Sequence, residues 1–440
     1  MTFALRFLFL AGMLAGTVRA EDAPRWWKGN LHTHTLWSDG DGFPEMIAEW
    51  YRDHGYHFLA LSDHNLLLQG QKWISVAEVA KRAKGEPWRG PGAQPPDAFG
   101  NYVARFGTHW VETRPAPTGG LAQVRLKPLD ECRALVEEAG RFLMIPAEEL
   151  THKSGDGHQI HMGAINVLDL VLPRDGATVR DVIALNLRAV EESAARTGRP
   201  VLVHVNHPNY QWGVTAEDLA AVVGQRFFEV WNGVVGDNDA GDVRRPSTDE
   251  IWDIANALRI AGGHAPPLFA VANDDSHNHQ GTRMHSVPGR AWVMVRARHL
   301  TPESILGAMR AGDFYPSTGV TLDDVRFDEG TRRLSLRIHP SAGETFVTRF
   351  VGTRRGVNLA GKPRRAPDGK VVDTTLDYTT GSGPQIGEVF GDSKDLNPSY
   401  ALAGDELYVR AVVTSSGKTE VPTTEFEFKR AWTQPVGWPR

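Results

Sequence analysis

The sequence has a single cysteine, Cys132, among its 440 residues, so no internal disulfide can form in any compartment. Leu129, Leu135 and Val136 share one helical face with this cysteine, and the spacing predicts a packed core thiol rather than a nucleophile. The stability of the fold must therefore come from a buried apolar core and from bound metal.

The chain also lacks a surplus of positive charge. Lys and Arg number 48 against 53 Asp and Glu, a formal net charge of −5. Because proteins that bind nucleic acids use a basic surplus to neutralise phosphates, we expect a small-molecule substrate and no nucleic acid. The sequence contains neither a Gly-x-Ser-x-Gly elbow nor a Gly-rich phosphate-cradling fingerprint, which argues against a serine hydrolase and a dinucleotide-binding fold.

The N-terminal apolar run is too short to cross a bilayer. Arg6 provides a positively charged start, residues 7–16 are apolar, and residues 18–20 form a small-residue cleavage site. This pattern predicts a signal peptide over residues 1–20 and a periplasmic or secreted product. We expect no integral membrane segment after its cleavage.

From residue 26 onward, strand-like apolar runs alternate with helical patterns. Strands are expected at residues 26–35, 58–61, 141–146, 161–170, 201–206, 227–231, 268–272 and 291–295, and helices at 44–55, 128–139, 178–195, 246–260 and 301–309. Such alternation predicts an α/β fold with a parallel sheet. Polar residues follow most of these strands and must meet at one place, so a barrel with its site at the strand C-termini is expected over residues 21–319.

Two regions depart from this alternation. Residues 69–127 are rich in Pro, Gly and aromatic residues, which predicts an insertion. It is either a lid over the site or a surface elaboration with its own small core. As a lid it would bring cations toward the substrate, with Lys81, Arg82, Arg105 and Arg114 as the candidates. From residue 320 to 440, short alternating runs between Gly, Pro and Asp turns predict a small all-β domain.

Histidines and carboxylates recur at the ends of the predicted strands. His32 and His34 alternate with threonine, so in an extended segment both point to one face and can hold one ion. Later strand ends supply further candidate ligands, namely Asp39, His64, Glu148 or Glu149, His158 or His161, His207, Asp275 and His277. This repetition predicts a metal site. Asp63 and Asp274 are expected to orient neighbouring ligands rather than to bind metal.

These motifs resemble those of the polymerase-and-histidinol-phosphatase (PHP) metallohydrolases. The resemblance rests on residues 32–35, 38–40, 62–65 and 275–277. Residues 231–233, 274–278, 289–292 and 315–319 are similar to a narrower group, the exported PHP-like proteins of the carbaryl hydrolase type (CehA/McbA-like). The resemblance covers residues 26–320, and the motifs are specific as an ordered set rather than singly.

The resemblance implies a distorted (β/α)7 TIM-like barrel that holds two to three divalent ions. Carried over onto this sequence, the first metal would be bound by His32, His34, Glu149 and Asp275. Glu149 would bridge to a second metal, completed by His161 and His207. A third would be held by Asp39, His64 and His277. The Pro-x-x-Glu spacing of the family favours Glu149 over Glu148. Imidazole and carboxylate ligands without thiolate suit Zn, Mn or Fe.

The implied activity is metal-dependent hydrolysis. A metal-bound hydroxide would attack the substrate, and His64, Asp275 and His277 are the residues expected to take part in catalysis. The superfamily resemblance favours phosphoester hydrolysis, whereas the narrower resemblance favours hydrolysis of carbamates or amides. A third possibility is a non-catalytic envelope-binding protein that keeps the barrel. Loss of ligands would mark this third class, yet every ligand position has a plausible occupant.

Overall fold

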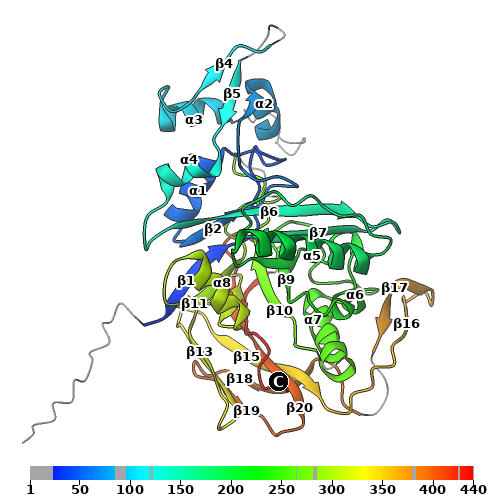
Figure 1. Ribbon diagram of the computed structural model, residues 1–440. Helices are drawn as coiled ribbons and strands as arrows, with labels where there is room; N and C mark the ends of the chain where they lie inside the picture. Colours follow the sequence, from blue (N-terminus) through cyan, green and yellow to red (C-terminus); the bar gives the residue numbers. More distant parts are fainter. Residues whose placement is uncertain are drawn as a thin grey trace, which may run out of the picture.

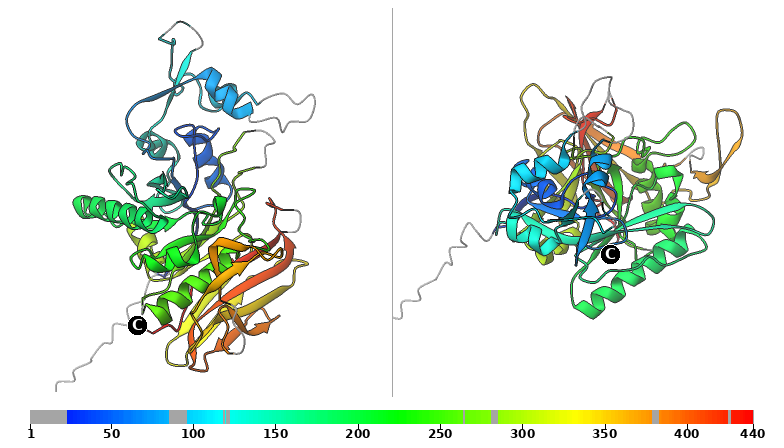
Figure 2. Two further views of the ribbon diagram at one scale, coloured as in Figure 1. Left: turned by 90° about the vertical axis from the view of Figure 1, so that its right-hand side faces the viewer. Right: turned by 90° about the horizontal axis from the view of Figure 1, so that it is seen from above.

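The computed structural model describes residues 23–439 except 85–95, 118, 120–121, 264, 281–284, 379–382 and 425–426. The predicted signal peptide lies outside the described residues. Figures 1 and 2 show the insertion at one end of the molecule, a central part of strands and helices, and the β-rich C-terminal strands at the other end. Among the described helices, none has the length and apolar character needed to cross a membrane.

The central part contains the elements that the apolar runs predicted, with ends that differ by a few residues. Its strands are β1 (Arg25–Asn30), β2 (Phe58–Leu61), β6 (Leu143–Lys153), β7 (Gln159–Ile165), β8 (Leu202–Val205), β9 (Phe227–Asn232), β10 (Phe269–Asn273), β11 (Trp292–Ala297) and β12 (Phe314–Ser317). Its helices are α1 (Pro44–Asp53), α4 (Leu129–Val136), α5 (Val179–Thr197), η2 (Tyr210–Trp212), α6 (Ala216–Ala221), α7 (Thr248–Ala257), η3 (Leu258–Gly262) and α8 (Pro302–Arg310). Capping boxes at Thr178, Thr215 and Ser247 start α5, α6 and α7.

The strands of the central part form one mixed sheet in the order β10-β9-β8-β7-β6-β2-β1-β11-β12. The neighbours β1, β2 and β6 are parallel, as are β8, β9 and β10. Strand β7 is antiparallel to β6 and β8, because a hairpin and not a helix joins it to β6. The α/β prediction is confirmed. The described strands do not close into a (β/α)7 barrel, since no strand ladder joins β10 to β1; a bridge between Thr33 and Ser276 and single hydrogen bonds such as Leu31 N–H to Asn273 Oδ1 link the two sides.

A single apolar core joins strands from both ends of the sheet order, β9 and β10 at one end and β11 and β12 at the other. It is formed by side chains of all nine central strands and α8, including Trp27, Phe58, Ile145, Ile165, Leu202, Phe227, Val271, Val293, Leu306 and Phe314. Because strands from both ends of the order pack on this shared core, the loops that follow β1, β2, β8 and β10 meet on one side. The candidate functional residues lie in those loops and in the adjoining parts of β6 and β7.

The insertion has no separate core among the described residues: its apolar side chains share one core with α1, α4, β2 and β6. It consists of β3 (Lys72–Ser75), α2 (Val76–Lys84), α3 (Ala98–Phe106), β4 (Thr113–Arg114) and β5 (Gln123–Leu126), with a three-stranded sheet in the order β3-β5-β4. Tyr102 stacks on Phe43 at 3.8 Å, and its hydroxyl donates a hydrogen bond to Glu45 of α1 at 2.7 Å. Trp110 Nε1 donates to the same carboxylate at 2.8 Å. These aromatic side chains therefore attach the insertion to α1 and do not form a lid over the site.

The C-terminal part continues the central sheet. Its strands are β13 (Leu322–Asp328), β14 (Arg333–Ile338), β15 (Phe346–Arg354), β16 (Lys362–Arg365), β17 (Val371–Asp377), β18 (Glu388–Ser393), β19 (Ser399–Ala401), β20 (Glu406–Lys418) and β21 (Phe428–Trp432). The last strand, β21, pairs with β12 through Ala431 and Ser317, so the sheet runs on in the order β12-β21-β20-β15-β18. A second sheet, β13-β14-β19, shares an apolar core with it.

A buried ion pair fixes this C-terminal part to α7. Arg410 Nε and Nη2 donate to the carboxylate of Asp253 at 2.9 and 2.7 Å, and the Tyr408 hydroxyl donates to it at 2.8 Å. All three side chains are buried. Nearby, Trp432 stacks on Trp231 of β9. A buried ion pair of this kind makes little net contribution while intact, but is costly to break from one side.

We expect Asp253→Ala to destabilise the protein strongly, because it leaves the Arg410 guanidinium buried without its main partner. The expected loss is about 3–5 kcal/mol in the free energy of unfolding, measured by urea denaturation. The matched control is Asp405→Ala, which removes an exposed partner of Arg354. Its expected effect is about 1 kcal/mol or less. Equal effects of the two substitutions would contradict this account of how the C-terminal part is held.

Candidate metal centre

The structure brings all nine predicted ligands together. They are His32 and His34 after β1, Asp39 in the following loop, His64 after β2, Glu149 in β6, His161 in β7, His207 after β8, and Asp275 and His277 after β10. Their side-chain donors form four overlapping groups, and within each group the donor atoms lie within 4.8 Å of one another. The strand-end positions that the sequence indicated thus converge in space.

The Glu149 carboxylate lies at the middle of the cluster, with histidines around both of its oxygens. The distances from Oε1 are 3.1 Å to His32 Nε2, 3.2 Å to His161 Nδ1 and 3.6 Å to His207 Nε2, and those from Oε2 are 2.7 Å to His64 Nδ1 and 3.4 Å to His34 Nε2. Asp275 Oδ1 lies 3.1 Å from His32 Nε2 and 3.0 Å from His34 Nε2. Two carboxylates therefore share the same pair of histidines.

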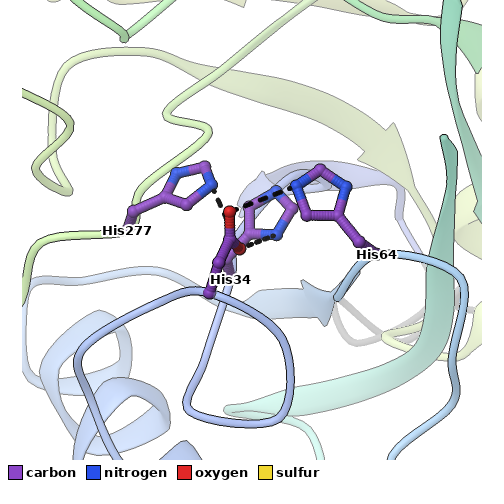
Figure 3. Close-up of side chains that lie close together, drawn as sticks. His34, His64 and His277 are labelled. Carbon is purple, nitrogen blue, oxygen red and sulfur yellow. Dashed lines mark ion pairs between the residues drawn. The ribbon is translucent and has the colours of Figure 1, made fainter. Parts of the chain in front are cut away.

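A second concentration of donors surrounds Asp39. His34 Nδ1 and His277 Nε2 lie 3.6 and 3.5 Å from its Oδ1, and His64 Nε2 lies 3.5 Å from its Oδ2. Figure 3 shows His34, His64 and His277 arranged around one point. The rings of His34 and His277 stack at 4.0 Å, an arrangement that would be repulsive with both rings protonated.

Three buried atoms of the cluster lack the hydrogen bonds that buried polar atoms normally make, and a bound metal ion would explain this. His34 Nε2, Glu149 Oε2 and Asp275 Oδ1 are buried and make no well-aligned hydrogen bond among the described residues, although His34 Nε2 lies 3.4 and 3.0 Å from the two carboxylate oxygens. Buried polar atoms are normally hydrogen-bonded, and leaving them unpaired costs free energy. A divalent cation among these atoms would satisfy all three at once. Imidazole and carboxylate donors without thiolate suit Zn, Mn or Fe.

The observed grouping agrees with the expected one around Asp39 and differs in detail elsewhere. His34 joins Asp39, His64 and His277 in one group. His207 falls with His32 and Asp275, although its Nε2 also lies within reach of Glu149. In these groups His32, His34, His64 and Glu149 each occur twice, so ions at the cluster would be close neighbours with shared ligands.

The two alternatives left open by the sequence have clear positions in the structure. Glu149 lies in the cluster, whereas Glu148 faces the other side of β6 and accepts a hydrogen bond from Val171 N–H at 2.8 Å. Burial raises the pKa of Glu148 to about 8. His161 lies in the cluster, and His158 lies in the hairpin that joins β6 to β7, outside the four groups.

Buried polar side chains hold the ligands in place. Glu229 Oε1 lies 2.9 Å from His32 Nδ1, and its Oε2 accepts a hydrogen bond from His207 N–H at 2.8 Å. Asn206 Nδ2 donates to Glu149 Oε1 at 2.7 Å. Sequence reasoning missed both residues. The available signal was a glutamate within the otherwise apolar run of β9 and an asparagine directly before His207.

Asp63 and Asp274 orient the ligand-bearing loops, as expected from the sequence. Asp63 Oδ1 accepts hydrogen bonds from the N–H groups of Thr35 and Ser38 at 2.9 and 2.8 Å. Asp274 accepts from the Tyr51 hydroxyl at 2.8 Å and from the backbone N–H groups of residues 289–291. Each carboxylate is thereby saturated by donors outside the cluster.

A cavity of about 310 Å³ opens onto the cluster. Beyond seven of the nine candidate ligands, it is lined by Tyr210, Val234, Asp237, Asn278, His285 and Ser286. Among the described residues no Lys or Arg lines it. Two arginines follow the 274–278 motif closely in the sequence. Arg290 donates to the backbone carbonyls of Gly233 and His285 and does not line the cavity, and Arg283 lies outside the described residues.

The four insertion cations that were candidates to reach the substrate have other partners. Lys81 and Arg82 pair with Glu78, Arg105 pairs with Glu49, and Arg114 lies over the ring of Trp73. None of the four lines the cavity.

Carboxylates hold several cluster histidines in the protonated form when no metal is bound. Burial lowers the pKa of His64, but the charge of Glu149 and a hydrogen bond with Asp39 outweigh it and raise this pKa to about 11. Burial is likewise outweighed at His277, where a hydrogen bond with Asp39 and the charge of Asp275 raise the pKa to about 9. The pKa of His207 is also about 9, raised chiefly by Glu149.

Metal binding at neutral pH should therefore release protons, because a histidine ligates metal only in its neutral form. We expect about four protons, from His32, His64, His207 and His277, to be released near pH 7. His32 is included because burial is outweighed there by the charges of Asp275, Glu149 and Glu229, which hold its pKa well above the usual value. The number should fall by about one near pH 9, where the free protein has already lost about half of each of the protons of His207 and His277. Isothermal titration of the metal-free protein in buffers of different ionisation enthalpy measures this number. Binding without proton release would contradict the assignment of these ligands.

Comparisons with known proteins give little further information. No family model matches the chain, and no curated protein matches its sequence. One similar solved structure is a two-domain protein from Bacteroides vulgatus that contains a predicted PHP-like metal-dependent phosphoesterase. It shares 12% identity, the match covers 89% of this chain and 91% of that one, and the TM-score is 0.37.

Two shorter matches have TM-scores of 0.29. A candidate metal-dependent phosphoesterase from Bifidobacterium adolescentis is 14% identical over 60% of this chain and 93% of its own. PsfC from Pseudomonas syringae is 12% identical over 62% of this chain and 83% of its own. Likenesses of this size establish neither the family nor the activity, so the function has to be argued from the side chains of the chain itself.

Proposed function

We propose that this protein is a metal-dependent hydrolase that cleaves phosphoesters of small molecules. The observation that carries the proposal is the convergence of three buried metal-ligating atoms, His34 Nε2, Glu149 Oε2 and Asp275 Oδ1, none of which makes a well-aligned hydrogen bond among the described residues, within a cluster that opens into a cavity. Two to three divalent ions of Zn, Mn or Fe suit this donor set. We also propose that residues 1–20 direct export to the periplasm or the medium.

Metal ions held by these ligands would supply a water of lowered pKa and would polarise the bond to be cleaved. The chain's own contribution is to fix the donors. Glu229 sets the ring orientation of His32, and Asn206 holds the Glu149 carboxylate. Partners of this kind are needed because a ligand that can rotate away binds metal more weakly.

Asp237 is placed to supply a proton to the leaving group. It lines the cavity, and its Oδ2 is buried without a hydrogen-bond partner among the described residues. Burial raises its pKa to about 7, although the neighbouring His207 opposes this shift. A carboxyl group that still carries a proton near neutral pH can donate it to the departing oxygen. Tyr210, whose ring lies 5.1 Å from that of His207, provides an aromatic wall for the organic part of a substrate.

The lining favours substrates of low negative charge. A dianionic phosphomonoester is usually bound with several Arg or Lys, and none lines the described cavity. A monoanionic phosphodiester requires fewer cations, and we therefore favour it within the phosphoester class. The same lining suits an uncharged carbamate or amide, which keeps the carbaryl-hydrolase type of activity as the second candidate. A non-catalytic binding protein is the least favoured, because each of the nine ligand positions holds a histidine or a carboxylate and all nine lie in the cluster.

Glu149→Gln should abolish most of the activity, since the amide cannot serve as an anionic bridging ligand. We expect kcat/KM for bis-p-nitrophenyl phosphate to fall by more than about 100-fold, with lower metal content by elemental analysis. Glu148→Gln is the matched control, because this neighbour faces away from the cluster, and it should stay near the wild type. Activity that survives in Glu149→Gln, or in wild-type protein stripped of metal, would refute the proposal. Turnover of 1-naphthyl methylcarbamate alone would favour the second candidate.

Asp237→Asn should have an effect that depends on the leaving group. Diphenyl phosphate needs a proton on its departing phenolate, so its kcat should fall by about 10²–10⁴-fold. Bis-p-nitrophenyl phosphate releases a stable anion and should be affected far less. The two rate constants, measured on protein of equal metal content, provide the test. An equal loss for both esters would show that Asp237 does not act as the proton donor.

A further inference from the structure

Asp39 is the least buried of the nine candidate ligands. Its side chain is 55% exposed, whereas that of His64, the next most exposed, is 25% exposed. Outside the histidine cluster, the described residues offer its carboxylate only the adjacent Ser38 hydroxyl at 3.1 Å, whose single proton also lies within reach of Asp63 at 2.6 Å. The position of this carboxylate is therefore set by the backbone of its loop, residues 36–40.

The inner side of this loop is fixed by the central part of the molecule. Asp63 accepts hydrogen bonds from both the N–H and the hydroxyl of Ser38, at 2.8 and 2.6 Å. Gly40 packs so closely on the backbone of His34 that a Cβ atom there would lie 2.7 Å from its carbonyl group. These contacts restrain the N–H side of the loop but leave its carbonyl groups to other partners.

The insertion supplies those partners. Arg82 Nη1 of α2 lies within hydrogen-bonding distance of the carbonyl oxygens of Leu36, Ser38 and Gly40. Lys72 Nζ of β3 donates to the carbonyl of the remaining inner residue, Trp37. The Trp37 indole in turn donates to the carbonyl of Lys127, just past β5, at 3.0 Å. Two side chains of the insertion thus reach four of the five carbonyls of a loop that carries a single candidate ligand.

From these contacts we propose that the insertion is a clamp for the Asp39 metal subsite. Arg82 and Lys72 act as positioning residues: by holding the loop 36–40 from outside, they keep Asp39 opposite His64 and His277. The inference rests on the proposed metal centre and gives the insertion a role in it. The ions bound around Glu149 and Asp275 should depend on the clamp much less, because those carboxylates lie on β6 and after β10 and are linked to the Asp39 group only through the shared His34 and His64.

The test is titration of the mature protein, insertion included, with Mn²⁺. Calorimetry measures the affinity of each binding step, and elemental analysis at a buffered free-metal concentration measures the number of bound ions. Arg82→Met and Lys72→Met should each weaken one metal-binding step by about 10–100-fold and the other steps by clearly less. Arg82→Lys should give an intermediate affinity, because lysine keeps the charge but cannot reach three carbonyls. Arg105→Met is the matched control, since Arg105 also belongs to the insertion but pairs with Glu49 of α1.

Wild-type affinity at every step in Arg82→Met and Lys72→Met would overturn the proposal. Equal weakening of all steps would also overturn it, because that result indicates a general loss of structure, and a thermal melt of each variant checks for such a loss. If the wild-type protein bound no metal, the metal centre itself would be wrong and the clamp with it. If it bound metal but cleaved no ester, the proposed activity would fail while the titration still decided the role of the insertion.

Discussion

The structure depends on the compensation of one buried charge. The Glu149 carboxylate is completely enclosed, and it can stay ionised there because histidines surround it and hold its pKa well below the usual range despite its burial. Without these partners a buried carboxylate would be protonated or would destabilise the fold. The compensating histidines come from the loops after β1, β2 and β8 and from β7, so the central sheet has to bring the ends of distant strands to one place.

The arrangement of the sheet and of the polar groups around the cluster follows from this requirement. A shared apolar core aligns the strands. Asp63, which follows β2, then holds the loop after β1, and Asp274, which follows β10, holds the backbone near Arg290; both do so by accepting backbone hydrogen bonds. Glu229 joins His32 and His207, which belong to loops far apart in the sequence. The cavity is thus built from rigid strand ends, while the exposed Asp39 loop obtains its rigidity from the insertion.

Much of this could be predicted from the sequence because it depends on local patterns. Continuous apolar runs such as Phe58–Leu61 mark buried parallel strands, and the polar residues that follow them mark the site. Three features required the tertiary structure. The antiparallel direction of β7 is set by a hairpin that resembles any other loop in sequence. Asn206 and Asp237 have a role only through what they face. The packing of Tyr102 on α1 is a contact between distant segments.

The central claim is that the nine clustered side chains bind several neighbouring divalent ions. Crystals of the protein grown with Mn²⁺, with diffraction recorded on both sides of the manganese absorption edge, test it most directly. The account predicts anomalous density at two or three positions, one between Asp39, His64 and His277 and the others beside the Glu149 carboxylate. Anomalous density absent from these positions, or present only at unrelated surface carboxylates, would contradict it.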